Sequence, residues 1–372
     1  KKEKRGEFTR AFYYWQTSLE SFDFRDSTFQ TLRVPKLYVR LFDVDWDEQT
    51  KRPVPVSPLE RRYPPWADTT RVVPVVFITN ETFAGLDGAG AKALAHLVHK
   101  KVLARLSRMH NADSYDNGEN QWWEQNPYRH KTKNFRRQAW KDSLHRAALQ
   151  RYEEIQFDCD WTASTRDRYF AFLREYKTFF PGKTLSATIR LYPYKYPGKA
   201  GVPPVDRGML MCYNAGNIRA AKTKNSLFDK AEVLSYLDGA GPYPLPLDYA
   251  LPVFSWGVLF RQGAFKDILS LVELSRHAGK LSVKDRRYYL DERPGRVVTV
   301  TEDFVLGEAY DSPLLRRGDQ VRIEKTPLGD VLEVAETLSQ RRQPGATLCL
   351  FHLNEHDLTQ RAPAIRLVFD SF

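Results

Sequence analysis

Short apolar runs alternate along the chain with stretches of helical periodicity, which is the pattern of a parallel sheet with crossover helices. Helical spacing is clearest at 88–109, after Ser164, at 265–274 and at 328–340. The apolar runs predict eight strands, at 11–19, 36–44, 72–79, 154–161, 185–193, 207–214, 249–257 and 346–353. Eight strands favour an α/β fold of the (β/α)8 (TIM) barrel type over an open doubly wound sheet. No glycine-rich phosphate loop follows the first run, which also counts against a dinucleotide-binding fold.

Two segments are too long to be ordinary connections in a compact domain, and long excursions of this kind are usually functional. Residues 111–150 precede the fourth predicted strand, and residues 276–325, which look β-rich, separate the seventh from the eighth. We therefore expect an N-terminal tether at 1–10 and a single barrel domain at 11–372. The two segments are expected to be insertions in that domain.

The composition excludes several classes of protein. The 372 residues are 42% hydrophobic and 13% aromatic, which supports a large core. No apolar run reaches about eighteen residues, so no membrane-spanning segment is expected. The net charge of +11 comes from basic residues scattered along the chain, and without a recognition motif we expect no nucleic-acid partner. Three isolated cysteines lack any CxxC spacing and are expected to be buried thiols.

The fourth predicted strand ends in a strict alternation of polar and apolar side chains. With a period of two, the apolar set packs against the helices and the polar set faces the lumen or mouth of the barrel. The apolar set is Phe157, Cys159 and Trp161, and the polar set is Gln156, Asp158, Asp160 and Thr162. Two carboxylates this close raise the pKa of one of them, which suits acid catalysis but also occurs in structural ion-pair networks.

The fifth predicted strand repeats this alternation and supplies a counter-charge. Arg190 and Tyr192 fall on its polar face, together with Ser186 and Thr188. In a barrel the carboxyl ends of neighbouring strands meet at one mouth. We therefore expect Arg190 to neutralise one of the two aspartates.

The motifs at two strand ends resemble those of glycoside hydrolase family 18, the chitinase family. That family carries Asp-x-x-Asp-x-Asp-x-Glu after strand four, and Asp158 and Asp160 match its two later aspartates. Its sixth strand ends in Met-x-Tyr-Asp or Met-x-Tyr-Asn, which here reads Met211-Cys212-Tyr213-Asn214. The resemblance covers roughly residues 11–265. It implies that Asp160 orients the acetamido group of a sugar and that Tyr213 is its hydrogen-bond partner.

The departure from the family motif concerns its acid. The family's general-acid glutamate stands two positions after the second matched aspartate, where this chain has Thr162, and Ile155 replaces the first aspartate of the longer motif. A threonine hydroxyl is far too weak an acid to protonate a glycosidic oxygen. The substrate's own acetamide is the nucleophile in that family, an exception to the two-carboxylate scheme. The resemblance therefore implies a site that holds sugar without cleaving it. We expect no cofactor and no metal.

Other residues could complete such a site. The candidates for substrate binding are Gln156, Asn214, Arg190, Tyr192, Trp256, Asp43, Asp45 and Glu355. Asp43 and Asp45 end the second predicted strand and equally fit a solvated acidic turn. Trp256, near the end of the seventh, could stack on a sugar ring. Glu355 lies close to His352 after the eighth, where a lone histidine without a second at metal spacing does not predict zinc.

The preferred hypothesis is a glycan-handling barrel of the cell envelope that binds without catalysis. One alternative is an active glycoside hydrolase that uses Asp158 or Asp160 with a relocated acid, which would be Asp43, Asp45 or Glu355. The other is a structural subunit of an envelope or secretion assembly, which would have protein partners. The charged start, without a methionine, fits an exported protein, periplasmic or at the cell surface, with a lipid anchor through a removed segment as one option.

Overall fold

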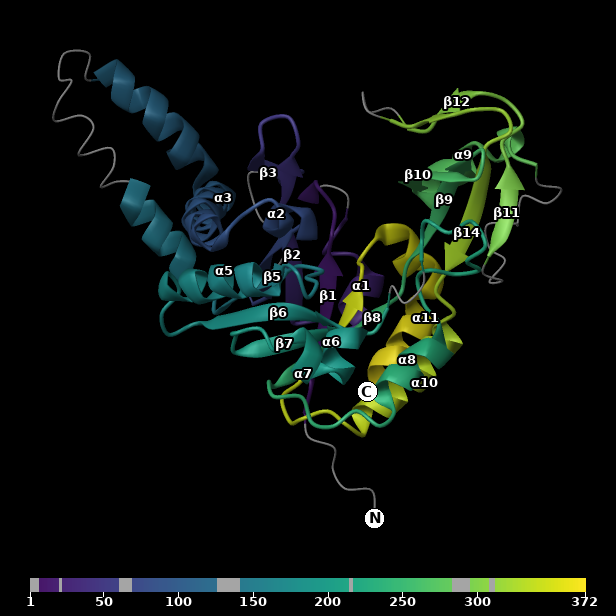
Figure 1. The fold of residues 1–372 in the computed structure, drawn as a ribbon. Coiled ribbons are helices and arrows are strands. Elements are labelled where there is room, and N and C mark those ends of the chain that lie inside the picture. The colour runs from purple at the N-terminus through teal and green to yellow at the C-terminus, as the bar shows by residue number, and fades with distance from the viewer. Residues whose placement is uncertain are drawn as a thin grey trace.

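The computed structural model describes residues 7–19, 22–59, 69–125, 141–213, 217–282, 295–307 and 312–372. The side chains of 111–125 and of residue 356 are outside that description. The centre of the molecule is a ring of parallel strands, and the carboxyl ends of these strands form one mouth of the barrel (Figure 1).

Within these residues, eight parallel strands close into a barrel, as the sequence predicts. The sheet order β1-β15-β8-β7-β6-β5-β4-β2 is completed by pairing of β1 with β2. The strands are β1 (Thr9–Tyr14), β2 (Lys36–Asp47), β4 (Arg71–Ile78), β5 (Glu154–Asp158), β6 (Thr184–Arg190), β7 (Arg207–Met211), β8 (Leu247–Pro252) and β15 (Thr347–Phe351). A further strand, β3 (Arg52–Val56), forms an antiparallel hairpin with the end of β2. The closed ring confirms the TIM-barrel fold.

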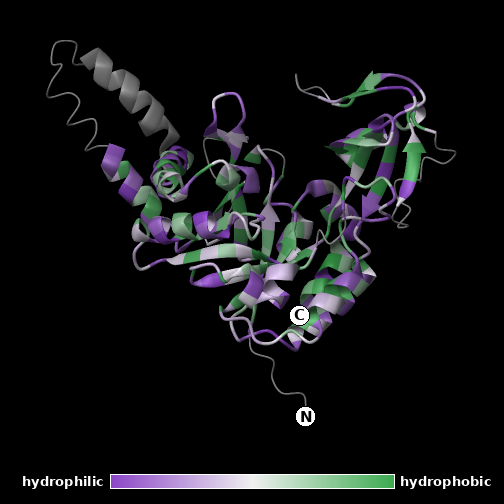
Figure 2. Cartoon of the chain, viewed as in Figure 1, coloured by the Kyte–Doolittle hydropathy of each residue, from purple (hydrophilic) through white to green (hydrophobic). Residues whose placement is uncertain are grey.

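Helices cover the outside of the ring. The long helix α3 (Gly88–Gln125) packs against α5 (Arg166–Thr178), and a further helix occupies 141–150. On another side, α8 (Lys230–Leu237), α10 (Leu328–Ser339) and α11 (Glu355–Ser371) pack in sequence. Shorter helices are α1 (Ser27–Thr31), α2 (Asn80–Ala84), α6 (Leu191–Lys195) and α7 (Pro197–Ala200). Hydrophobic residues concentrate on the barrel strands and on the inner helix faces (Figure 2).

The seventh strand is shorter than the sequence indicates. The apolar run at 249–257 spans the end of β8 and the beginning of β9 (Ser255–Arg261), which belongs to a different sheet. The helix expected at 265–274 is wrong in its first half, where β10 (Ala264–Leu269) pairs with β9, and α9 (Leu271–Arg276) follows. Gln262 and Gly263 both have positive φ, 52° and 77°. That backbone favours a tight hairpin, which overrides the local helical spacing.

A second sheet rises beside the barrel mouth because its chain leaves the carboxyl end of β8. Its order is β10-β9-β14-β11, with β11 (Arg296–Thr299) and β14 (Gln320–Lys325), and a ribbon of β12 (Phe304–Val305) and β13 (Leu314–Leu315) adjoins it. It has a separate apolar core that includes Leu259, Leu274 and Ile323. We refer to residues 255–325 as the inserted sheet. It begins about twenty residues before the 276–325 segment that the sequence marks.

In the described part of the chain, no helix is both long and apolar enough to cross a membrane.

Candidate functional site

The end of β5 places two aspartates at the barrel mouth in different surroundings. Asp158 is the last residue of β5 and accepts a hydrogen bond of 2.6 Å from Thr188 Oγ1 on β6. Burial and the neighbouring Asp160 raise the pKa of Asp158 to about 7, against the opposing effects of Thr188 and Arg190. Asp158 is therefore an acid that exchanges its proton near neutral pH.

Asp160 lies beyond the strand and is paired. Its Oδ2 is 3.1 Å from NH1 of Arg190, which ends β6, and the two side chains are 53% and 45% exposed. This pairing confirms that Arg190 neutralises one of the two aspartates. At that exposure the pair contributes little stability. Its consequence is positional, because the Arg190 guanidinium holds the Asp160 carboxylate at the end of β6.

Thr162, at the position of the family's acid, is part of a turn that begins α5. Its backbone N–H donates to Thr165 Oγ1 at 2.9 Å, and its hydroxyl lies 2.9 Å from Ser164 Oγ. The residue that precedes α5 is Thr165, not the expected Ser164. Thr165 Oγ1 in turn donates to Asn80 Oδ1 at 2.7 Å. The chain therefore uses hydroxyls here to fix the strand-to-helix turn.

Tyr213 follows β7 and lies almost entirely out of solvent. Its ring stacks on Phe351 of β15 with centroids 5.2 Å apart, and its hydroxyl donates to Met211 Sδ at 3.6 Å. Burial raises the pKa of Tyr213 above its usual value, and the charge of Asp158 adds to this effect. Tyr213 thus remains a neutral hydroxyl near both aspartates.

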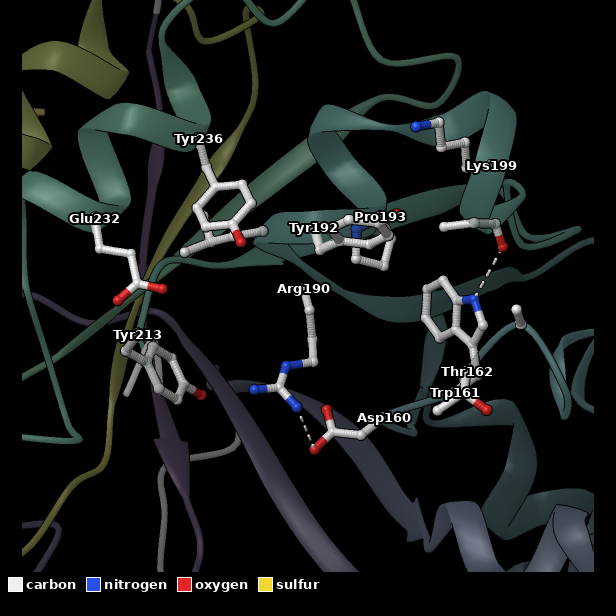
Figure 3. Close-up of a pocket in the computed structure, with 13 residues that line it drawn as sticks. Asp160, Trp161, Thr162, Arg190, Tyr192, Pro193, Lys199, Tyr213, Glu232 and Tyr236 are labelled. Atoms are coloured by element: carbon white, nitrogen blue, oxygen red, sulfur yellow. Dashed lines mark hydrogen bonds and ion pairs between the residues drawn. The ribbon is translucent and has the colours of Figure 1, made fainter. Parts of the chain in front are cut away.

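A cavity of about 460 Å³ opens over these groups. In Figure 3 the Arg190 guanidinium lies between the Asp160 carboxylate and the Tyr213 hydroxyl. The residues that line the cavity include Asp160, Trp161, Thr162, Arg190, Tyr192, Lys199, Tyr213, Glu232 and Tyr236. Tyr192 is 49% exposed, and it lies on α6 rather than on the fifth strand as expected. The cavity combines aromatic faces with two carboxylates and two cations, which suits a polar ring such as a sugar.

Glu232 and Tyr236 are cavity residues that sequence reasoning misses. They lie one turn apart on α8 and face the space beside Tyr213 and Tyr192 (Figure 3). Burial raises the pKa of Glu232, and Asp229 adds to this. The available signal, Asp229-x-x-Glu232 before an apolar run, indicates a helix start and not a site. Asp229 is indeed the N-cap, accepting from the Glu232 N–H at 3.0 Å.

Three of the expected site residues serve other contacts. Gln156 is fully buried in the lumen, where its amide bonds Tyr13 and Ser186, so it does not line the cavity. Asp43 is bound by the Arg40 guanidinium, with Nε 2.6 Å from Oδ1. Asp45 is exposed at the hairpin to β3 and accepts from Thr79 Oγ1 at 3.1 Å.

Trp256 and Glu355 line a different hollow of about 1290 Å³, between the barrel mouth and the inserted sheet. Trp256 is on β9 and not on a barrel strand, and its Nε1 donates to Glu324 Oε2 at 2.7 Å. Glu355 is the exposed first residue of α11. Asn214 lies outside the described residues. Among those described, no cluster of three or more metal-ligating side chains occurs.

The comparisons with known proteins concern structure and not sequence. No family model matches the chain, and no curated protein matches it. The structural matches include a glycoside hydrolase family 18 N-acetylglucosaminidase from Paenibacillus barengoltzii, with 10% identity, 98% and 99% of the two chains covered and a TM-score of 0.46. They also include the spore cortex-lytic enzyme SleL of Bacillus cereus, with 15% identity, 100% of this chain and 76% of that chain covered and a TM-score of 0.46. A third is a class V chitinase from Nicotiana tobaccum, with 11% identity, 98% and 100% covered and a TM-score of 0.44. At these values the barrel assignment rests on the strand pairing of this chain itself.

Proposed function

We propose that this barrel binds a glycan with N-acetylated sugars at the cavity beside Asp160 and Tyr213, and that it does not cleave it by acetamide assistance. The observation that carries the proposal is the state of two motif positions. Thr162 stands in the acid's place with its hydroxyl turned to Ser164, and Asp160 is paired with Arg190. The cavity keeps aromatic platforms in Tyr192 and Tyr236 but lacks a carboxyl at the family's acid position.

Binding and turnover can be separated experimentally. Titration calorimetry with N-acetylglucosamine oligomers and with peptidoglycan fragments should give saturable binding, while chromatography of the same mixtures should show no products. Tyr192→Ala should weaken binding by about tenfold, since one stacking contact is worth about 1.4 kcal/mol. Tyr249→Phe is the matched control, because Tyr249 packs on Phe372 away from the cavity. Clear turnover that Asp160→Ala abolishes would defeat the proposal.

A second candidate function, an active hydrolase, is favoured by one observation: an acid does reach the space beside Tyr213. That acid is Glu232, in place of the expected Asp43, Asp45 or Glu355. Both Glu232 and Asp158 have raised pKa values, as general acids do. If this alternative holds, Glu232→Gln abolishes product formation and leaves oligomer binding within threefold. Absence of turnover in the wild-type chain rules it out.

We propose an exported protein, periplasmic or at the cell surface, in contact with other envelope proteins. A purely structural subunit would have a partner over the strand-end face, which co-purification from native envelopes would reveal. Oligomer binding to the isolated chain would then be absent, in contrast to the preferred function.

A further inference from the structure

The inserted sheet contains a buried ion pair on β14. Arg322 is 1% exposed and Glu324 is 0% exposed, and Arg322 Nε is 2.7 Å from Glu324 Oε1. Burying two charges is costly unless every remaining donor and acceptor is satisfied. The hydrogen-bond partners of Arg322 and Glu324 therefore show which segments this ion pair joins.

Arg322 makes two further hydrogen bonds outside the sheet. NH1 donates to the carbonyl of Ala220 at 2.7 Å, and NH2 donates to the carbonyl of Ile218 at 3.0 Å. Both carbonyls belong to residues 217–228, the segment that connects β7 to α8; we call it the linking segment. The three bonds leave from three different nitrogens of a planar guanidinium, whereas the donors of a lysine all lie on a single nitrogen.

Glu324 binds the same linking segment from its other oxygen. Oε2 accepts from Ser226 Oγ at 2.6 Å and from Trp256 Nε1 at 2.7 Å. Asn225 Nδ2 adds a hydrogen bond of 3.1 Å to the carbonyl of Lys325, the last residue of β14. The linking segment is thus bound to β14 at several points along its length.

The linking segment leads directly into α8, whose first residue is also fixed. Lys230 pairs with Asp330 at 3.0 Å and with Glu333 at 2.8 Å, both on α10. Helix α10 follows β14 after two residues. The last strand of the inserted sheet and the helix that follows it therefore hold both the approach to α8 and its first turn.

From these contacts we propose that Arg322 is a positioning residue for the glycan cavity. It acts through the linking segment on α8, which carries Glu232 and Tyr236 into the cavity. The inserted sheet then fixes the position of α8, which forms one wall of the cavity, and is not only a separate lobe beside the barrel mouth. This inference rests on the proposed function for its ligand, but the anchoring of α8 can be measured without one.

A comparable ion pair in the same sheet supplies the control. Arg261 binds Asp319 through Nε at 2.9 Å and NH2 at 2.8 Å, and it donates to the carbonyl of Leu314. These three contacts all stay within the inserted sheet. Loss of the two hydrogen bonds from Arg261 to Asp319 should weaken the inserted sheet without moving α8.

The experiment compares Arg322→Lys, Ser226→Ala and Arg261→Lys in the full chain. Amide hydrogen exchange is followed for 217–228 and 230–237, and affinity is measured for an N-acetylglucosamine oligomer. Arg322→Lys should speed exchange in both segments and weaken affinity by about tenfold, within the range of long-range coupling. Ser226→Ala, a milder change on the linking segment itself, should act in the same direction and covers the case in which Arg322→Lys fails to fold. Arg261→Lys should leave both readouts unchanged.

Unchanged exchange of 230–237 in Arg322→Lys and Ser226→Ala would overturn the inference. Faster exchange with unaltered affinity would overturn it as well, because the cavity wall would then not depend on the anchor. If the wild-type chain binds none of the oligomers, the proposed function fails, while the exchange of 230–237 still decides whether Arg322 positions α8.

Discussion

At the scale of the residue, Asp158 shows how a single carboxyl can differ from its neighbour two positions away. Asp158 is the end of a strand, next to a hydroxyl and facing a second aspartate, whereas Asp160 is half-exposed beside Arg190. Burial disfavours the charged form of Asp158, and its pKa rises to about 7. The same residue type thus gives a buried acid with a raised pKa at one position and an exposed partner of an arginine at the other.

This raised pKa makes stability depend on pH. Between about pH 4 and pH 7 the folded state holds the Asp158 proton while the unfolded state, with a pKa near 3.9, has lost it. The free energy of unfolding therefore falls as pH rises through this window. Asp158→Asn, whose amide oxygen can still accept from Thr188, should remove a few kcal/mol of that fall, as pKa shifts of this size imply. Urea unfolding of both chains from pH 4 to pH 8 measures the difference, and parallel curves would contradict it.

At the scale of the element, the turn between β5 and α5 determines what the motif position can do. Thr165 is fully buried, and its hydroxyl accepts from the Thr162 N–H and donates to Asn80 on α2. A strand that ends and a helix that begins within seven residues leave several backbone groups to be satisfied by side chains. Hydroxyl residues do this locally, and Thr162 is one of three in the turn.

Removal of the central hydroxyl should therefore destabilise the turn. Thr165→Val keeps the shape but leaves the Asn80 oxygen and the Thr162 N–H without this partner, which costs about 1–3 kcal/mol. Ser164→Ala, at an exposed neighbour, should change the free energy of unfolding by less than about 0.5 kcal/mol. Chemical denaturation of the two variants and the wild type distinguishes them. Equal stability of both variants would show that the turn is held by packing alone.

At the scale of the whole molecule, the barrel is tied together by polar contacts across its lumen. Lys36 of β2 pairs with Glu154 of β5 at 2.8 Å, with side-chain exposures of 11% and 10%. Ser186 of β6 donates to the other oxygen of Glu154 at 2.7 Å. The first contact joins β2 and β5, which are separated by β4 in the ring, and the second joins the neighbouring strands β5 and β6; both lie at the end of the barrel opposite the cavity.

Breaking this lumen pair should cost far more than breaking an exposed one. Lys36→Met leaves the Glu154 charge buried, and we expect a loss of about 3–5 kcal/mol. Adding Glu154→Gln should restore part of it, because the uncompensated charge is then gone. Lys51→Met, which removes the exposed pair with Glu48, should cost no more than about 1 kcal/mol. Thermal and denaturant unfolding of the four chains give the comparison; similar losses for Lys36→Met and Lys51→Met would contradict it.

The fold was predictable because apolar periodicity is a local signal. Eight buried strands with helices between them leave few arrangements other than a closed ring, and the pairing of β1 with β2 confirms it. The same signal failed at 249–274, where an apolar run continued across two sheets and helical spacing coincided with a hairpin. Local spacing cannot show which sheet a strand joins, because pairing is decided by distant segments.

By itself, the sequence determined the barrel, the alternation that sends Asp158 into the mouth while Phe157 packs outward, and the pairing of Arg190 with an aspartate. The tertiary structure decided which groups share the cavity. Glu232 and Tyr236 reach the cavity from α8, a helix about seventy residues after Asp160 in the chain. Trp256 lies instead on the inserted sheet, where it binds Glu324. Strand periodicity fixes the direction of a side chain relative to its own element, but the meeting of side chains from separate elements depends on how those elements pack.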